Sequence, residues 1–472
     1  MSSYEADLGV VPPFDAELLR RQPASAPRYT SYPTAPQFNA RFGEREFRAC
    51  AERSNESGGP LSLYVHIPFC TSPCFYCGCN RIITRDAAAA EEYGRYVSRE
   101  LAALAPLFDA RRLIVQLHLG GGTPNFLERA AVAALVDEIA RRFRLSGEPE
   151  RDFSIELDPR FLPQGYVEAL AELGFNRASL GVQDFDRAVQ LAVNRVQSVE
   201  QTLETIEACR AAGFRSINVD LIYGLPRQTL RGFAQTLETL VAARPSRLAI
   251  YSYAHLPELF KAQRQIEAAD LPDVETKLGL LKLAIETLAA AGYRYIGMDH
   301  FALPQDDLAR AQASGGLHRN FMGYTTHAEC TLLAAGVSAI SHVAESYSQN
   351  FRDLRGWSAA LDAGRLPIWR GLALDFDDVL RAEIIQELMC RGRIEIEAVE
   401  RRHGIDFAQY FAESLRRLGP LVADELVTVD AERIRLTPRG RLLVRSVAMC
   451  FDRYLEPAPA AAEPHRRFSR AI

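Results

Sequence analysis

Apolar runs alternate with amphipathic stretches between about residues 61 and 345. The amphipathic stretches, such as 202–212 and 275–291, predict helices because their apolar positions recur at helical spacing. Strands that alternate with helices are typical of a parallel sheet with right-handed crossovers. The runs that predict strands are 61–67, 113–119, 153–157, 177–182, 216–222 and 247–253. About six strand–helix units are visible, so we predict an α/β fold with an incomplete (β/α)6 barrel.

Polar and glycine residues gather where these predicted strands end. In a parallel barrel the carboxyl ends of the strands meet at one rim, and that rim carries the active site. The residues that we therefore expect at one site are Cys70, Gly120-Gly-Gly-Thr-Pro124, Glu156, Gln183, Asp220 and Ala254.

The pattern changes on both sides of this region. Pro27-Arg-Tyr-Thr-Ser-Tyr-Pro33 places two tyrosines between prolines, which predicts an ordered, extended arm. Beyond about residue 375 the pattern predicts helices at 379–390 and 407–418, a hairpin of 426–429 with 434–436, and a further helix. We predict three domains: an arm (1–50) that contacts the active site, the barrel (51–350), and a mainly helical cap with a winged hairpin (351–472). Residues 456–462 are typical of a linker.

Composition and charge exclude several classes of protein. The net charge of −5 gives no electrostatic basis for binding nucleic acid. No run of about eighteen apolar residues is present to span a membrane, and the first residues lack the basic and apolar regions of a secretory signal. We therefore predict a cytoplasmic protein with neither a nucleic acid nor a membrane as partner.

Four of the nine cysteines lie close together, directly after the first predicted strand. Cys70, Cys74 and Cys77 have the spacing C-x3-C-x2-C, and Cys79 follows two residues later. Ferredoxin-type sequences supply a cysteine for every iron of a cluster, whereas three thiolates leave one iron open to a small molecule. A purely structural or electron-carrying cluster and a zinc site are the alternatives. Zinc sites usually take pairs of close cysteines, and no second pair follows.

The segment from Tyr64 to Asn80, Tyr-Val-His-Ile-Pro-Phe-Cys-Thr-Ser-Pro-Cys-Phe-Tyr-Cys-Gly-Cys-Asn, resembles the signature of radical S-adenosylmethionine enzymes. More narrowly, it resembles the family of oxygen-independent coproporphyrinogen III oxidases. The resemblance covers nearly the whole chain. The further motifs that carry it are 27–34, Ile222-Tyr-Gly-Leu-Pro226, Gly297-Met-Asp-His-Phe301, His318-Arg-Asn320 and Phe468-Ser-Arg-Ala-Ile472.

The resemblance implies a [4Fe-4S] cluster held by Cys70, Cys74 and Cys77, with Cys79 not a ligand. It also implies two molecules of S-adenosyl-L-methionine. The residues implied for the cluster-bound molecule are Tyr64, Gly121, Glu156 and Ile340. The residues implied for the second molecule are Tyr76, Gly122, Thr123, Gln183, Arg195, Asp220 and Ala254.

The implied substrate is coproporphyrinogen III, in which two propionates become vinyl groups to give protoporphyrinogen IX. Its four carboxylates need positive partners when they are buried, and the candidate contacts are Arg28, Tyr29, Tyr32, Arg81 and Arg319. No residue is assigned as a general acid or base. We expect a monomer that takes electrons from a low-potential donor and passes them to an unknown acceptor.

Two alternatives to this function stay open, and three segments depart from the family pattern. A haem-binding chaperone of the same superfamily would share the three cysteines, and a DNA-binding oxygen sensor would use the winged hairpin. The departures are His327-Ala-Glu-Cys330, Tyr76 in place of the commoner phenylalanine, and His342-Val-Ala-Glu345.

Overall fold

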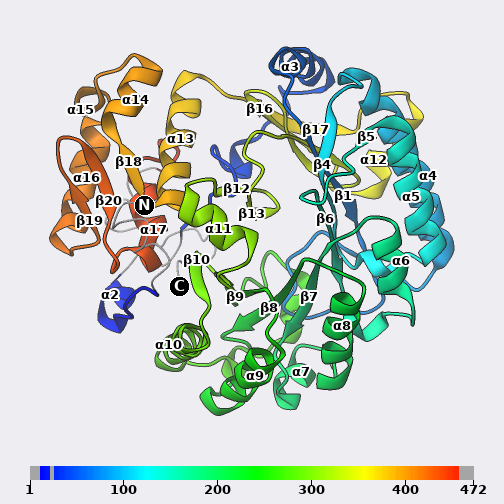
Figure 1. Cartoon of the computed structure of the whole chain (residues 1–472), viewed down its shortest axis with the longest axis horizontal. Helices are drawn as coiled ribbons and strands as arrows, with labels where there is room; N and C mark the ends of the chain where they lie inside the picture. The colour runs from blue at the N-terminus through cyan, green and yellow to red at the C-terminus, as the bar shows by residue number, and fades with distance from the viewer. Residues whose placement is uncertain (1–10, 22–25, 456–472) are drawn as a thin grey trace. The chain divides into compact units, whose positions relative to one another are not determined.

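The computed structural model describes residues 11–21 and 26–455, and these fall into two compact units (Figure 1). The barrel unit comprises residues 37–277 and 329–373, and the helical unit comprises the described parts of 1–36, 278–328 and 374–472. These units divide the chain elsewhere than at the predicted boundaries near residues 50 and 350, so the three-domain division stays a prediction. The predicted linker at 456–462 and the family motif at 468–472 lie outside the described residues.

Six parallel strands form the centre of the barrel unit and confirm the prediction. Each strand pairs in parallel with the next in chain order, so the spatial order is β1, β4, β6, β7, β8 and β9. Their side chains are buried almost continuously, as in Leu61–Ile67, because a parallel sheet is covered on both faces. The strands are β1 (Leu61–Ile67), β4 (Leu113–Gly121), β6 (Asp152–Leu157), β7 (Arg177–Gln183), β8 (Ser216–Tyr223) and β9 (Arg247–Ser252).

Within the barrel unit β1 does not close onto β9. It pairs instead with β14, which runs parallel to it, and β15, β16 and β17 continue the sheet antiparallel to one another. The sequence pattern does not predict these four strands. Three of them, β14 to β16, are short and follow one another closely along the chain. They are β14 (Thr331–Ala335), β15 (Ile340–His342), β16 (Ser346–Asn350) and β17 (Ile368–Ala373).

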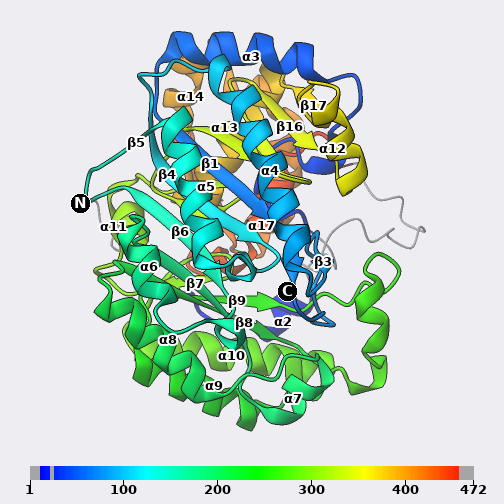
Figure 2. The same ribbon diagram turned by 90° about the vertical axis from the view of Figure 1, so that its right-hand side faces the viewer.

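The crossover helices lie on the outer side of the strands (Figure 1), and Figure 2 shows several of them in front of the sheet. Helix α8 begins at Val199, three residues before the predicted start, because Ser198 and Gln201 form a capping box. The helices of this unit are α3 (Glu44–Ser57), α4 (Ala87–Leu104), α5 (Arg129–Arg142), α6 (Tyr166–Glu172), α7 (Arg187–Ala192), α8 (Val199–Ala211), α9 (Leu230–Ala243) and α12 (Leu354–Asp362). Helix α10 (Val274–Ala290) begins at the end of the barrel unit's first segment.

The helical unit has its own core and small sheets. Strands β19 (Val427–Val429) and β20 (Arg433–Leu436) form the predicted hairpin, and β18 (Arg393–Glu395), which was not predicted, pairs with β20. Two further hairpins join β10 (Arg294–Gly297) to β11 (His300–Ala302) and β12 (His318–Asn320) to β13 (Gly323–Thr325). The helices are α2 (Ala16–Arg21), α11 (Asp307–Ser314), α13 (Phe376–Arg391), α14 (Ile396–His403), α15 (Phe407–Tyr410), α16 (Ala412–Ala423) and α17 (Val444–Met449).

One predicted helix, 407–418, is wrong as a single element. The chain leaves helical geometry at Phe411, with φ −100° and ψ 22°, which separates α15 from α16. The Phe411 ring is buried against Phe407 and Phe451, with ring centroids 4.7 and 5.5 Å apart. Packing of this side chain therefore decides where the helix breaks, and the helical spacing of apolar residues does not reveal it.

Helices long and apolar enough to cross a membrane are absent from the described residues.

Candidate active site

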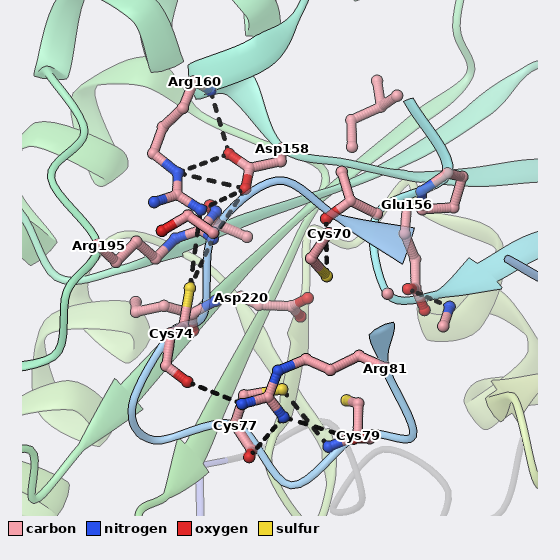
Figure 3. Close-up of a pocket in the computed structure, with 18 of the residues that line it drawn as sticks. Cys70, Cys74, Cys77, Cys79, Arg81, Glu156, Asp158, Arg160, Arg195 and Asp220 are labelled. Carbon is pink, nitrogen blue, oxygen red and sulfur yellow. Dashed lines mark hydrogen bonds and ion pairs between the residues drawn. The ribbon is translucent and has the colours of Figure 1, made fainter. Parts of the chain in front are cut away.

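A cavity of about 230 Å³ lies at the carboxyl ends of the parallel strands in the barrel unit (Figure 3). It is lined from six places in the sequence: the loop after β1, the carboxyl-terminal parts of β4, β6, β7 and β8 with the residues that follow β4 and β6, and the loop after α7, which carries Arg195. The structure therefore brings most of the residues expected at one site to the lining of a single cavity. The predicted residues that line the cavity are Cys70, Cys74, Tyr76, Cys77, Arg81, Gly121, Gly122, Thr123, Glu156, Gln183, Arg195 and Asp220.

The cysteine loop is closed by hydrogen bonds from its own backbone and from Arg81. The Cys77 N–H donates to the Cys74 carbonyl at 3.2 Å, and the Thr84 N–H donates to the Cys70 carbonyl at 3.0 Å. The Arg81 guanidinium donates to the carbonyls of Cys77 and Cys74 at 2.9 and 3.3 Å. Arg81, predicted as a substrate contact, thus lines the cavity while it holds the loop that carries the thiols.

The thiols of this loop differ in acidity. A hydrogen bond from Cys79 is the largest influence on Cys77, and with the nearby Arg81 guanidinium it lowers the pKa of that thiol to about 6. Burial raises the pKa of Cys70 to about 11. The thiolate is the form that binds metal, and the lowered pKa favours the thiolate of Cys77 at neutral pH. The three thiols around one cavity fit the donor set of an iron–sulfur cluster. Cys79 also lines the cavity, so its exclusion as a ligand stays a prediction.

The glycine loop packs so closely on its neighbours that side chains do not fit. A Cβ on Gly121 would lie 2.5 Å from the His66 ring, and Gly121 has a φ of +120° that L-residues rarely adopt. A Cβ on Gly122 would lie 2.6 Å from the Pro68 carbonyl oxygen. The Thr123 hydroxyl donates to Cys70 Sγ at 3.4 Å. The glycine loop is therefore docked directly against the cysteine loop.

Glu156 is oriented from β4. The Gly121 N–H donates to Glu156 Oε2 at 2.9 Å, and His118 Nε2 lies 3.4 Å from Oε1. His118 is itself positioned by Ser154 Oγ at 2.7 Å from Nδ1, and the Tyr64 ring stacks on the imidazole with centroids 5.6 Å apart. Burial opposes ionisation, but His118 and the Gly121 N–H hold the pKa of Glu156 below its usual value. The group is a fixed carboxylate.

A buried ion group lies beside Cys74, and only its Arg195 was predicted. Arg195 Nη1 lies 3.1 Å from Asp158 Oδ2, and Arg160 Nη2 lies 2.7 Å from the same oxygen. The two guanidiniums also approach Cys74 Sγ at 3.6 and 3.7 Å. Burial disfavours the charged form of Asp158, but Arg195 and Arg160 hold the pKa of this carboxyl below its usual value. The position of Asp158, two residues beyond Glu156, was the signal that could have revealed this group.

The cavity wall contains polar atoms without protein partners. Among the described residues, Gln183 Oε1, Arg195 Nε and Arg81 Nε are buried and accept or donate no hydrogen bond. Burial raises the pKa of Asp220 to about 6, although Asn218 and Ser179 donate hydrogen bonds to it. Buried polar atoms normally have partners, so this cavity fits a polar ligand.

Three predicted cofactor residues lie outside the cavity lining. Tyr64 lies behind it, with its hydroxyl 2.9 Å from His66 Nδ1, and Ile340 begins β15. Ala254 is linked to the cavity indirectly, because the Gln263 amide donates both to the Ala254 carbonyl at 3.2 Å and to the Tyr76 carbonyl at 2.9 Å.

The other predicted substrate contacts belong to the helical unit. Tyr29 and Tyr32 are each 3% exposed and pack in its core. The Tyr29 hydroxyl donates to Asp452 Oδ2 at 3.0 Å, and the Tyr32 hydroxyl accepts from the Arg453 N–H at 3.0 Å. Arg28 forms an ion pair with Asp299, and the Arg319 Nε donates to the Arg28 carbonyl at 3.3 Å. The two tyrosines therefore pack residues 29–32 into the core of the helical unit.

The chain matches two family models, several curated relatives and a solved structure. Residues 64–240 match the model of the radical SAM superfamily, and residues 374–443 match that of the HemN C-terminal domain. The chain is 48% identical to the oxygen-independent coproporphyrinogen III oxidase of Pseudomonas aeruginosa, over 97% of this chain and 99% of the relative. It is 45% identical to the Escherichia coli enzyme of the same name, over 97% and 98%. The solved structure of coproporphyrinogen III oxidase (HemN) from Escherichia coli superposes with a TM-score of 0.90 at 44% identity, covering 94% of this chain and all of the other. The chain belongs to the family of oxygen-independent coproporphyrinogen III oxidases, within the radical SAM superfamily.

Proposed function

We propose that this enzyme oxidises coproporphyrinogen III to protoporphyrinogen IX without oxygen, by converting two propionate side chains into vinyl groups. The observation that carries the proposal is the convergence of three thiols, a glycine loop and an oriented carboxylate on one cavity. Each conversion removes one hydrogen atom, one electron and one carbon dioxide from a propionate. The relatives compared above bear the name of the oxidase, and this favours the oxidase over the haem-binding chaperone.

Membership of the superfamily implies a [4Fe-4S] cluster and S-adenosyl-L-methionine. We assign Cys70, Cys74 and Cys77 as the cluster ligands, since they line the cavity together and have the C-x3-C-x2-C spacing of the family motif. When bound, the cluster and S-adenosyl-L-methionine supply the one-electron chemistry that removes a hydrogen atom from the substrate. Arg195 and Arg160 donate toward Cys74 Sγ, and hydrogen bonds to cluster sulfurs are one means by which a protein sets the reduction potential.

We further propose that the cavity residues hold two molecules of S-adenosyl-L-methionine. Glu156 and the Gly121 loop would hold the cluster-bound S-adenosyl-L-methionine, with Tyr64 and Ile340 behind them. The second molecule would take the other side, where Gln183 Oε1 and Arg195 Nε are buried without partners among the described residues. Asp220 also lines the cavity, and Tyr76, Gly122, Thr123 and Ala254 complete the proposed set.

The remaining parts of the proposal concern the partners. We assign Arg28, Arg81 and Arg319 to the carboxylates of the substrate, with Tyr29 and Tyr32 supporting the segment that carries Arg28. We further propose a cytoplasmic monomer that receives electrons from a low-potential donor.

Anaerobic reconstitution of the full chain tests the function. With iron, sulfide, S-adenosyl-L-methionine and a low-potential reductant, we expect 5′-deoxyadenosine release and loss of two carboxyl groups from coproporphyrinogen III. Cys74→Ala should abolish both. Full activity in that variant, or deoxyadenosine release by the wild type without any decarboxylation, would contradict the proposal.

A further inference from the structure

The turn between β10 and β11 in the helical unit is built under backbone strain. Met298 adopts a positive φ of 54°, which is uncommon for a residue with a side chain. Gly297 has a φ of +150°, and a Cβ there would collide with the Tyr324 hydroxyl. The Tyr295 hydroxyl donates to the Met298 carbonyl at 3.0 Å and braces the turn. Strain of this kind persists where the surrounding structure holds it, and it is frequent at ligand sites. The residue that follows Met298 in this turn is Asp299.

Cationic side chains from separate segments gather around Asp299. Arg28 forms an ion pair with its carboxylate. Although burial opposes ionisation, Arg28, His300, Arg445 and Arg319 together hold the pKa of Asp299 below its usual value. Arg445 Nη1 donates to the Ala26 carbonyl at 3.1 Å, two residues before Arg28. Arg28 therefore pairs with Asp299, and Arg319 and Arg445 both donate to the backbone of the segment that carries Arg28.

Arg319 is the member of this group with unused hydrogen-bonding capacity. Arg319 is 4% exposed, and its guanidinium carbon lies 4.8 Å from the centroid of the Tyr324 ring. Among the described residues its Nη1 has no hydrogen-bond partner, and its Nε donates to a backbone carbonyl rather than to a carboxylate. A guanidinium has five N–H donors that suit a carboxylate, and a buried one without such a partner is unfavourable. Arg28, by contrast, is 34% exposed at its side chain, which gives the group an open side.

We propose that Arg28, Arg319 and Arg445, arranged around Asp299, form a binding site for one carboxylate of the porphyrinogen substrate. This inference rests on the proposed function and deepens it. The incoming carboxylate accepts from Arg319 and Arg28. Asp299 is a positioning residue that holds the guanidiniums together while the site has no ligand.

Binding of coproporphyrin III, the oxidised tetracarboxylate, to the reconstituted full-length enzyme tests the site without turnover. Its tetramethyl ester has the same ring without charges and serves as the second probe. Arg319→Met should weaken binding of the acid at least tenfold and leave binding of the ester unchanged. Arg310→Met is the matched control, because Arg310 belongs to the same unit, is 60% exposed and pairs only locally with Asp307 among the described residues.

Two further variants keep the test decisive if Arg319→Met does not fold. Arg28→Met removes a partly exposed side chain and should also weaken binding of the acid alone. Asp299→Asn should lower the melting temperature of the free enzyme, and coproporphyrin III should raise it by more than in the wild type. If the folded arginine variants bind the acid as tightly as the wild type does, the site is wrong even when the wild type decarboxylates its substrate. If the acid-specific loss is found in an enzyme that does not decarboxylate, the site stands and the proposed function fails.

Discussion

The Gly121 N–H donates to Glu156 Oε2 at 2.9 Å, which ties the end of β4 to the end of β6. The two residues lie 35 positions apart, but parallel strands bring their carboxyl ends to one edge of the sheet. The backbone of the glycine loop and the carboxylate therefore form one unit. A substitution of Gly121 or Glu156 should therefore alter how the other residue binds a ligand.

Gly121→Ala should disrupt this unit. The added methyl group would meet the His66 ring, and the φ of +120° is strongly disfavoured for alanine. We expect a loss of about 1–3 kcal/mol in the free energy of unfolding, together with a large loss of S-adenosyl-L-methionine binding. Denaturant unfolding and calorimetric titration measure the two effects.

Gly94→Ala is the control for this substitution. Gly94 lies in α4 with open space where its Cβ would be, so alanine should stabilise the protein by about 0.5–1 kcal/mol. A Gly121→Ala protein as stable as the wild type, with unchanged ligand binding, would show that the loop is not constrained as described.

Cys74→Ala and Cys79→Ala should separate ligand from non-ligand thiols. Loss of Cys74 removes one of three thiols proposed to hold the cluster, so iron and sulfide per chain should fall several-fold after reconstitution. Cys79→Ala should retain nearly full iron content, although the pKa of Cys77 should rise because the Cys79 hydrogen bond is lost. Iron and sulfide analysis with electron paramagnetic resonance of the reduced cluster provides the measurement. Equal losses in both variants would make Cys79 a ligand.

Arg81→Met should loosen the cysteine loop. Its guanidinium donates to the carbonyls of Cys77 and Cys74, and each hydrogen bond to a charged group contributes about 1.5–3 kcal/mol. We expect slower cluster assembly and a cluster lost more readily to a chelator. Arg85→Met, in an exposed position four residues later, is the control. Identical chelation rates in the two variants would refute a structural role for Arg81.

Asp220→Asn should change the pH dependence of stability in the cluster-free chain. Burial raises the pKa of Asp220 from 3.8 to about 6. Its contribution to the free energy of unfolding is therefore fully present below about pH 3.8 and is lost as the pH rises through 6. Asparagine does not ionise, so the variant should gain about 1.4 kcal/mol relative to the wild type between pH 5 and pH 7.5. Urea unfolding at both pH values measures this, with Asp137→Asn on the surface of α5 as control. Parallel pH curves for Asp220→Asn and the wild type would contradict a raised pKa.

Local signals were enough to predict the six parallel strands. Gly121 ends β4, and Glu156 and Asp220 lie in the later halves of β6 and β8, so a parallel sheet brings all three toward one edge. The same reasoning missed β14 to β17; the first three of these are short strands in quick succession, which carry little periodicity. It also missed the break at Phe411, which depends on the packing of one ring.

The sequence by itself determined the spacing of the three cysteines, the order of the six parallel strands, and the family to which the chain belongs. These depend on neighbours along the chain, so they can be read without coordinates. Only the tertiary structure decided that Arg81 closes the cysteine loop, that Asp158 and Arg160 join Arg195 beside Cys74, and that Arg319 has a buried donor without a partner among the described residues. Hydrogen bonds and ion pairs of this kind join residues that are distant in sequence, and their strength depends on burial, which the folded chain alone establishes.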